Sequence, residues 1–193
     1  MHGLILRALR GYLIATLGPD RWRDVLDGAG LHGEQPLTLL FGGSEALRRA
    51  LESAARLLGR SCGVIMEETG VFVVTCPVQP VVRRLLRLGG ATFEEFLHSL
   101  EELPDRARLA LPVYDFPRVD LDIPGPGVFR LRCHAPSEEL LGLALGALRA
   151  MAADYGQPAT IERTAAGKGM EIVIRLIDAS RSGWQRSAVA ATG

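Results

Sequence analysis

Histidine and cysteine, two residue types that often carry catalysis or bind metals, are few in this chain, and they lie far apart. The 193 residues include four histidines, none at metal-ligand spacing: His2, His32, His98 and His134. The sequence contains no nucleophile elbow, P-loop, GxGxxG or HExxH motif. Glu101, Glu102, Asp105 and Arg106 form a charge run typical of a solvated surface. We therefore predict that the protein is not an enzyme.

The three cysteines, Cys62, Cys76 and Cys133, match neither a disulfide framework nor a zinc site, because they are odd in number and scattered. Cysteines of this kind are typical of a reducing compartment. Two readings of Cys76 and Cys133 remain open. They are small apolar fillers of a core, or one of them supplies a thiolate to a metal such as iron.

Composition excludes several function classes. Apolar residues make up 48% of the chain, and 22 basic residues balance 22 acidic ones, so no net charge favours nucleic acid or an anionic membrane. Residues 3–17 resemble a signal peptide superficially, but Arg7 and Arg10 interrupt the apolar run. No apolar stretch reaches the length of a membrane-spanning helix. We expect a soluble cytoplasmic protein with one domain.

The most informative stretch runs from Ala91 to Arg118. Thr92 and Glu95 have capping-box spacing and predict a helix start. Its apolar stripe consists of Phe93, Phe96, Leu97, Leu100 and Leu103. The next position on that stripe is Pro104, and a proline inside a helix costs about 3 kcal/mol. We therefore expect the helix to kink at Leu103, or to stop there and restart with Pro104 at its first position.

The remaining pattern predicts an α+β fold. Amphipathic or capped helices are expected at residues 4–16, 20–29, 44–58 (capped by Ser44), 78–88 and 137–155, with only a short piece around 64–68. Strands are expected at 119–123 and 128–134, followed by a hairpin built from residues 160–163 and 170–177. Phe129, Leu131 and Cys133 should share one face of their strand, opposite Arg130 and Arg132. The tail from Asp178 is expected to be loose.

Three segments resemble the heme-nitric oxide/oxygen binding (H-NOX) family of bacterial gas sensors and soluble guanylate cyclases. The opening MHGLILRALRGYL…GPDRWRDVLDGAGL and the segment VFVVTCPVQPVVRRLLRLGG are similar to the family's first helices and to the approach to its proximal helix. The proximal pattern FLxxLxxLHxxxxxxYP corresponds here to FLHSLEELPDRARLALP, followed by Pro117. The resemblance implies one H-NOX-like domain over residues 1–177, divided into helices (1–60) and a proximal-helix and sheet part (61–177), with a tail at 178–193.

The resemblance implies heme, yet the residues that would anchor it differ. Pro104 stands where the family has its iron-ligating histidine, and proline has no basic nitrogen. The family's YxSxR motif, which holds the heme propionates, corresponds here to Cys133, Ala135 and Ser137. The bidentate arginine and two hydrogen-bonding groups are therefore absent from their places. Pro117, by contrast, matches the proline that presses on the porphyrin.

Other residues are candidates for a displaced site. His98 lies six residues before position 104, about 240° around a regular helix, so it should point away from the Leu100 face. It is either a polar surface residue or a displaced iron ligand. Cys76 matches a pocket cysteine of some relatives. Five apolar residues suit either a heme slot or an ordinary core: Leu4, Ile5, Phe72, Leu100 and Leu145.

Two functions follow from the resemblance. The first is a sensor of NO or another small ligand, through heme or a related group held by a residue other than position 104. It would signal to a separate protein such as a histidine kinase or a cyclic-(di)nucleotide enzyme. No tyrosine lies in 138–148, which implies selectivity for NO and CO over O2 if heme is bound. The second is a heme-independent regulatory or interaction module that keeps the fold.

Overall fold

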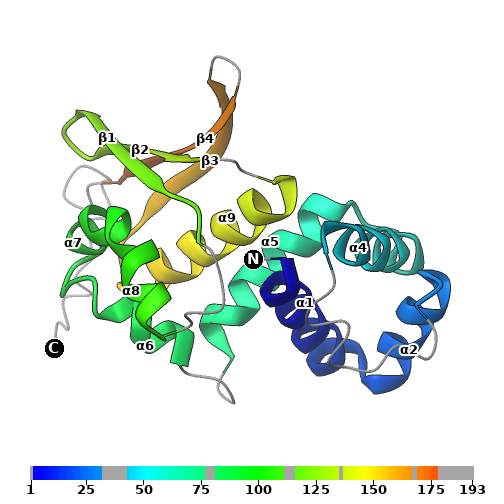
Figure 1. Ribbon diagram of the computed structural model, residues 1–193. Helices are drawn as coiled ribbons and strands as arrows, with labels where there is room; N and C mark the ends of the chain where they lie inside the picture. Colours follow the sequence, from blue (N-terminus) through cyan, green and yellow to red (C-terminus); the bar gives the residue numbers. More distant parts are fainter. Residues whose placement is uncertain are drawn as a thin grey trace, which may run out of the picture.

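A computed structural model describes residues 2–31, 43–76, 81–110, 116–134, 137–166 and 169–177. Its helices are α1 (His2–Leu17), α2 (Pro19–Gly28), α4 (Ser44–Leu58), α5 (Cys62–Thr75), α6 (Val81–Arg87), α7 (Phe93–His98), the 3-10 turn η1 (Ser99–Glu101), α8 (Leu103–Ala110) and α9 (Glu138–Asp154). Its strands are β1 (Val119–Gly125), β2 (Val128–Cys133), β3 (Ala159–Ala166) and β4 (Gly169–Leu176) (Figure 1). The predicted α+β class is confirmed. The expected loose tail lies outside the described residues.

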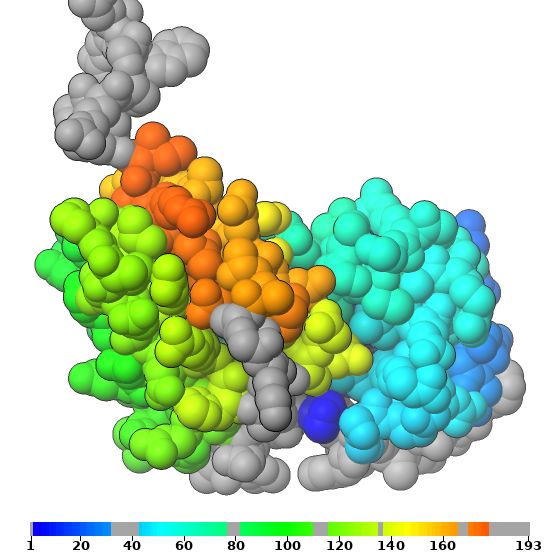
Figure 2. Space-filling view, turned by 90° about the horizontal axis from the view of Figure 1, so that it is seen from above, coloured from blue at the N-terminus to red at the C-terminus, as the bar shows by residue number. Residues whose placement is uncertain are grey.

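The apolar residues form two separate cores. The first, among α1, α2, α4 and the start of α5, is centred on Leu9, Leu13 and Leu47. The second lies between α7, α9 and the sheet and includes Phe96 and Phe129. Figure 2 shows the corresponding lobes as two blocks of colour. We call them the helical lobe and the sheet lobe.

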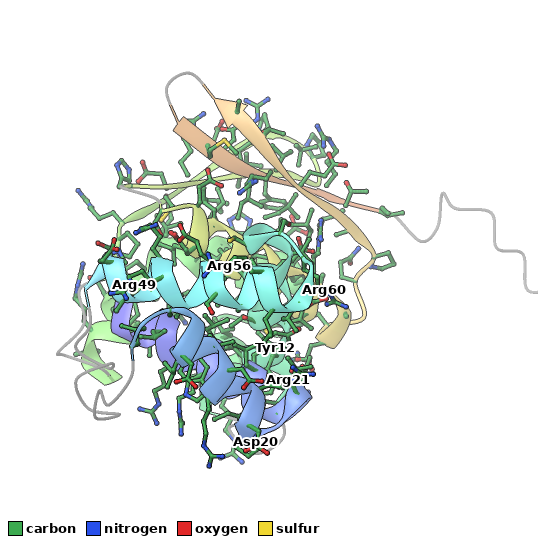
Figure 3. All side chains as sticks on the ribbon, turned by 90° about the vertical axis from the view of Figure 1, so that its right-hand side faces the viewer. Tyr12, Asp20, Arg21, Arg49, Arg56 and Arg60 are labelled. Carbon is green, nitrogen blue, oxygen red and sulfur yellow. The ribbon has the colours of Figure 1, made fainter. Side chains whose placement is uncertain are left out.

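Arginines of α4 hold the helical lobe together at the end of α2. Arg49 donates to the carbonyl of Gly30 at 3.1 Å, and Arg56 donates to the carbonyl of Gly28 at 3.2 Å (Figure 3). Gly28 is the last residue of α2, and the last carbonyls of a helix lack partners within it and carry partial negative charge, so the Arg56 guanidinium stabilises this end. Ser44, predicted to cap α4, is instead its first residue. The N-cap is Gly43, with no side-chain cap.

A polar cluster joins α1 to α5. The Tyr12 hydroxyl donates to Glu68 at 2.5 Å, and Arg60 donates to both oxygens of the same carboxylate at 2.5 and 2.6 Å. Burial, together with the hydrogen bond to Glu68, raises the pKa of Tyr12 to about 12. The phenol therefore stays protonated, and keeps this contact, well above neutral pH.

Helix α5 is longer than the sequence predicted. One continuous helix covers Cys62–Thr75 where only a short piece around 64–68 was expected, and Ser61 caps it by accepting from the amide of Val64. Both lobes pack on α5, so its buried residues do not all lie on one side. Its sequence therefore shows no polar stripe. The predicted start of the next helix near Val78 lies outside the described residues. The described helix α6 begins at Val81.

The sheet is antiparallel in the order β1-β2-β4-β3, and α9 covers one face of it. Phe129 pairs with Ile174 and Leu131 with Ile172, so the predicted apolar face of β2 packs into the sheet-lobe core. On the opposite face, Arg132 bonds Glu171 at 3.2 Å. The predicted hairpin and the predicted cap of α9 by Ser137 are both confirmed.

The two lobes meet where α5 and α9 cross with almost no side chain between them. A Cβ atom on Gly70 would overlap the carbonyl of Leu143, and one on Gly146 would overlap the carbonyl of Glu67. A Cβ on Gly142 would come within 2.8 Å of the Met66 side chain. Only glycine permits such an approach of two backbones.

Replacement of Gly146 by alanine should therefore destabilise the protein by about 1–3 kcal/mol, because the added methyl forces the helices apart. The matched control is Gly63→Ala, also helical, where an added Cβ meets nothing within 4 Å. That variant should keep or gain stability, by up to about 1 kcal/mol. Urea unfolding midpoints of the two variants measure the difference. Equal midpoints would contradict tight packing at this crossing.

The Tyr12 contact predicts a specific loss of stability in alkali. Because the folded pKa is raised from 10.0 to about 12, the stabilisation is complete below pH 10 and is lost as pH rises through about 12. Tyr12→Phe should lose about 1 kcal/mol at neutral pH and show a shallower alkaline decline. Urea midpoints across this pH range test it. An unchanged alkaline slope in the variant would show that another group is responsible.

Candidate functional site

The segment that resembles a proximal helix is broken into two helices. The capping box is present, since Thr92 accepts from the Glu95 amide at 3.1 Å and Glu95 accepts from the Thr92 amide at 3.4 Å. Regular helix ends at His98, η1 follows, and α8 starts at Leu103 with Pro104 in second position. Proline has no amide hydrogen to donate to the carbonyl four residues earlier. The predicted interruption is thus confirmed, although the regular helix ends five residues before Leu103.

Side chains brace the break. Arg106 of α8 donates to the carbonyl of Ser99 at 2.9 Å and to its hydroxyl at 3.0 Å. Glu101 accepts from the amide of Leu121 at 2.9 Å and so attaches η1 to β1. The predicted solvated surface is confirmed for Glu101, Glu102 and Asp105, which are exposed, whereas Arg106 is half-buried. Both side chains bind backbone groups, Arg106 in η1 and Glu101 in β1.

The position of the family's iron ligand is buried but chemically inert. Pro104 is buried, and its ring nitrogen is part of the amide. His98, the one histidine of this segment, is exposed and lies edge-on to Phe129 of β2, with ring centroids 5.7 Å apart. Among the residues that the structure describes, no group of three His, Cys, Asp or Glu side chains is placed to hold a metal ion.

The residues that correspond to the propionate anchors have other contacts or environments. Ser137 accepts from the amide of Leu140 at 3.2 Å as the N-cap of α9. Cys133 is half-buried at the end of β2, and burial raises the pKa of its thiol, so the thiolate is disfavoured. Arg132, on the other sheet face, bonds Glu171. Ala135 lies outside the described residues.

The remaining predicted site residues do not meet in one space. Leu100 and Leu145 belong to the core of the sheet lobe, whereas Ile5 belongs to that of the helical lobe, and the partly buried Phe72 packs against the latter. Leu4 is half-buried on α1.

The two remaining candidates from the resemblance lie at element ends. Cys76 is half-buried and ends α5, its amide donating to the carbonyl of Phe72 at 2.8 Å. Pro117 is half-buried just before β1.

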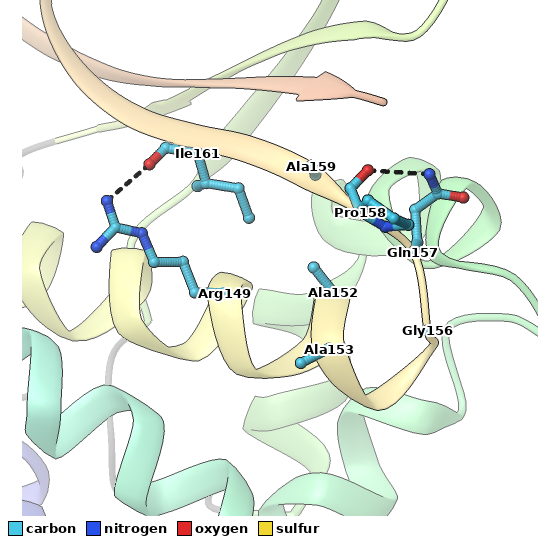
Figure 4. Close-up of a pocket in the computed structure, with 8 residues that line it drawn as sticks. All are labelled: Arg149, Ala152, Ala153, Gly156, Gln157, Pro158, Ala159 and Ile161. Atoms are coloured by element: carbon cyan, nitrogen blue, oxygen red, sulfur yellow. Dashed lines mark hydrogen bonds between the residues drawn. The ribbon is translucent and has the colours of Figure 1, made fainter. Parts of the chain in front are cut away.

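A groove that the sequence did not reveal lies between α9 and β3. It has a volume of about 370 Å³. Figure 4 shows the residues that line it: Arg149, Ala152, Ala153, Gly156, Gln157, Pro158, Ala159 and Ile161. The only signal in the sequence was the run of small residues at the end of the predicted helix, facing the small residues that start the next strand. Such a run is also common in plain helix packing.

Comparison with known proteins places the chain in a family. The haem-NO-binding family model matches residues 2–163, and the chain therefore belongs to the H-NOX family. An unliganded Fe(II) H-NOX mutant from K. algicida has a TM-score of 0.74 at 12% identity, covering 93% of this chain and 98% of that one. An S. oneidensis H-NOX protein in the Fe(II)NO state has a TM-score of 0.72 at 16% identity, covering 92% and 100%.

A third similar structure links the fold to a wider class. An oxygen-binding H-NOX domain described as related to soluble guanylate cyclases has a TM-score of 0.65 at 15% identity, covering 92% of this chain and 96% of that one. H-NOX domains are sensor domains, and the family's domains of known structure bind heme. In the part of this chain that the structure describes, no helix is long and apolar enough to cross a membrane.

The residues present do not fit the family's mode of holding heme. The ligand position is a buried proline, the one nearby imidazole is exposed, and the serine that aligns with the family's arginine caps a helix instead. Position 104 therefore lacks an iron donor, the His98 imidazole is exposed, and position 137 lacks the guanidinium that would pair with a propionate. A thiol of raised pKa does not replace the missing imidazole.

The raised pKa of Cys133 is directly measurable. In a variant with Cys62 and Cys76 replaced by serine, the thiol should ionise with a midpoint above 9.0 in the folded protein, because burial opposes the charge. The alkylation rate of the thiol as a function of pH measures this midpoint. The same protein in urea is the control and should return to about 9.0. A folded midpoint below 9.0 would instead make Cys133 a credible metal ligand.

Proposed function

We propose that this chain is a non-catalytic regulatory domain that retains the H-NOX fold but does not use histidine-ligated heme. The observation that carries the proposal is the buried Pro104 at the ligand position, together with the helix break around it. The exposed position of His98 supports it, because a displaced ligand on the same helix would have to face inward.

The domain would act through a separate signalling protein. H-NOX domains commonly signal to partners such as cyclases or kinases, and we infer a histidine kinase or a cyclic-(di)nucleotide enzyme as the class of partner. The two lobes share the α5–α9 crossing, so an effector that prefers one lobe arrangement would shift the population of that arrangement. A partner that contacts both lobes would read the shift.

A second candidate keeps heme or a related tetrapyrrole, held by another residue, and senses NO. The observation that favours it is the position of Cys133, half-buried on β2, the strand that also contacts the His98 ring through Phe129. Cys76 is a further possible ligand. Ligation by either thiol would have to overcome the cost of forming a thiolate.

Hemin titration with absorption spectroscopy tests the proposal. The protein, produced in cells supplied with a heme precursor, should show no stoichiometric Soret band and no saturable hemin binding. A stoichiometric band that shifts with NO would contradict the proposal and support the second candidate. His98→Ala, Cys133→Ser and Cys76→Ser would then identify the ligand.

The variant Pro104→His distinguishes a missing ligand from a missing space. We expect it to bind hemin no better than the parent chain, because the expected slot residues belong to two different cores. Leu109→His is the control, since it adds an imidazole to α8 at an exposed position. A histidine-type Soret band in Pro104→His alone would show that the space for heme persists and that the ligand is the only part lost.

A further inference from the structure

The two outer strands of the sheet, β1 and β3, differ in what lies at their free edges. At the edge of β1, the 3-10 turn η1 packs against the strand, and Glu101 accepts from the amide of Leu121 at 2.9 Å. In β3, by contrast, Glu162, Arg163 and Ala165 are exposed. Strand β3 is therefore the more accessible edge of the sheet.

Hydrogen bonds at the end of β4 show which of its residues turn toward β3. The amide of Leu176 donates to the carbonyl of Gly127, just before β2, at 2.8 Å. The amide of Ile177 donates to the carbonyl of Pro158, just before β3, also at 2.8 Å. Successive residues of an antiparallel strand thus bond alternately to its two neighbours. Ile174, two residues before Leu176, therefore turns toward β2 and away from β3.

The backbone groups of every second residue of β3 point to the free edge. Ile161 lies opposite Ile174, so its own backbone groups point outward, and those of Arg163 and Ala165 follow with a period of two. Arg149 of α9 donates to the carbonyl of Ile161 at 2.9 Å, which agrees with this direction. In the part of the chain that the structure describes, the amides of Ile161, Arg163 and Ala165 have no hydrogen-bond partner. Such a row of unpaired groups is a template for a further strand.

The groove between α9 and β3 lies beside the start of this edge. It is lined by Ile161 and Ala152, which are buried, and by exposed Ala153. Figure 4 shows Ile161 and Ala152 on opposite sides of the space. In a strand added to β3, every second side chain would point to the side of α9. The groove would bury an apolar side chain at one of these positions.

A second copy of β3 is a poor occupant of this edge. The antiparallel registers with the longest overlap, which also bring the outward backbone groups face to face, centre on Glu162 or on Arg163. Each register places that residue opposite its own copy, and like charges directly opposite each other destabilise a strand pair. A strand of different sequence avoids this repulsion. For the same electrostatic reason, a basic residue opposite Glu162 would be favoured.

We propose that β3 accepts an extended strand of a partner protein, paired antiparallel along residues 161–165, with an apolar side chain in the groove between α9 and β3. Backbone hydrogen bonds would supply affinity, and the groove and Glu162 would select the sequence. Arg149 does not block this pairing, because a carbonyl oxygen such as that of Ile161 has a second lone pair. The proposal rests on the proposed function only in taking the partner to be a separate chain.

Peptides selected from a random linear library displayed on phage, with the full chain as the target, test this proposal. Synthetic copies of the enriched peptides are labelled with fluorescein, and their binding is measured by anisotropy. Arg163→Pro should weaken binding about tenfold, because it removes an outward amide and leaves the pairing of β3 with β4 intact. Arg163→Ala is the matched control. It loses the same ion pair with Glu138 but keeps the amide, so its affinity should stay within about twofold of the parent.

Three outcomes would overturn the proposal. The first is a library that yields no peptide enriched on the parent chain over Arg163→Pro. The second is equal affinity of the peptides for Arg163→Pro and Arg163→Ala, because the peptides would then bind elsewhere. The third is a parent chain that light scattering shows to be a dimer while Arg163→Pro is a monomer, because a second copy would then occupy the edge.

The readouts are separate from those of the proposed function. Circular dichroism and urea midpoints verify that each variant is folded before affinities are compared. Peptide binding is measured without hemin, so failure of the strand proposal leaves the hemin result unchanged. A Soret band in the hemin titration would likewise leave the peptide result unchanged.

Discussion

The backbone contact between α5 and α9 is the constraint on which the rest of the structure depends. Gly70, Gly142 and Gly146 allow the helices to approach until backbone meets backbone, and each lobe then builds its core on one side of this crossing. Helix α5 contributes Ile65 to one core and Val74 to the other. The relative position of the lobes is thus set by main-chain shape, with few rotatable side chains to adjust it.

Sequence patterns predicted those elements whose signals are local. The Thr92 and Glu95 capping box, the Ser137 cap and the alternation of β2 each depend on neighbours within a few residues, and each was confirmed. Helix α5 was underestimated because it is packed between two lobes, so the periodic contrast that marks a surface helix is missing. Tertiary burial, and not helix propensity, determines its length.

The candidate site, too, could be predicted from the sequence only in part. The sequence alone shows that Pro104 stands where the family has an imidazole. It does not show that Ile5 and Leu100 belong to different cores, because that depends on how distant helices cross. The same holds for the groove beside β3, where the residues that matter are alanines and a glycine, whose side chains give no chemical signal. Its character arises from what the neighbouring elements leave empty.

The break at η1 also has a mechanical consequence. A continuous helix acts as a stiff rod and carries a push from one end to the other, whereas two short helices joined by a single tight turn bend at the joint. Here the joint is attached sideways, since Glu101 holds the amide of Leu121 on β1. Force applied to α8 would thus be diverted into the edge of the sheet instead of travelling along α7. At η1 the segment is therefore coupled to the edge of the sheet as well as to its neighbouring helices.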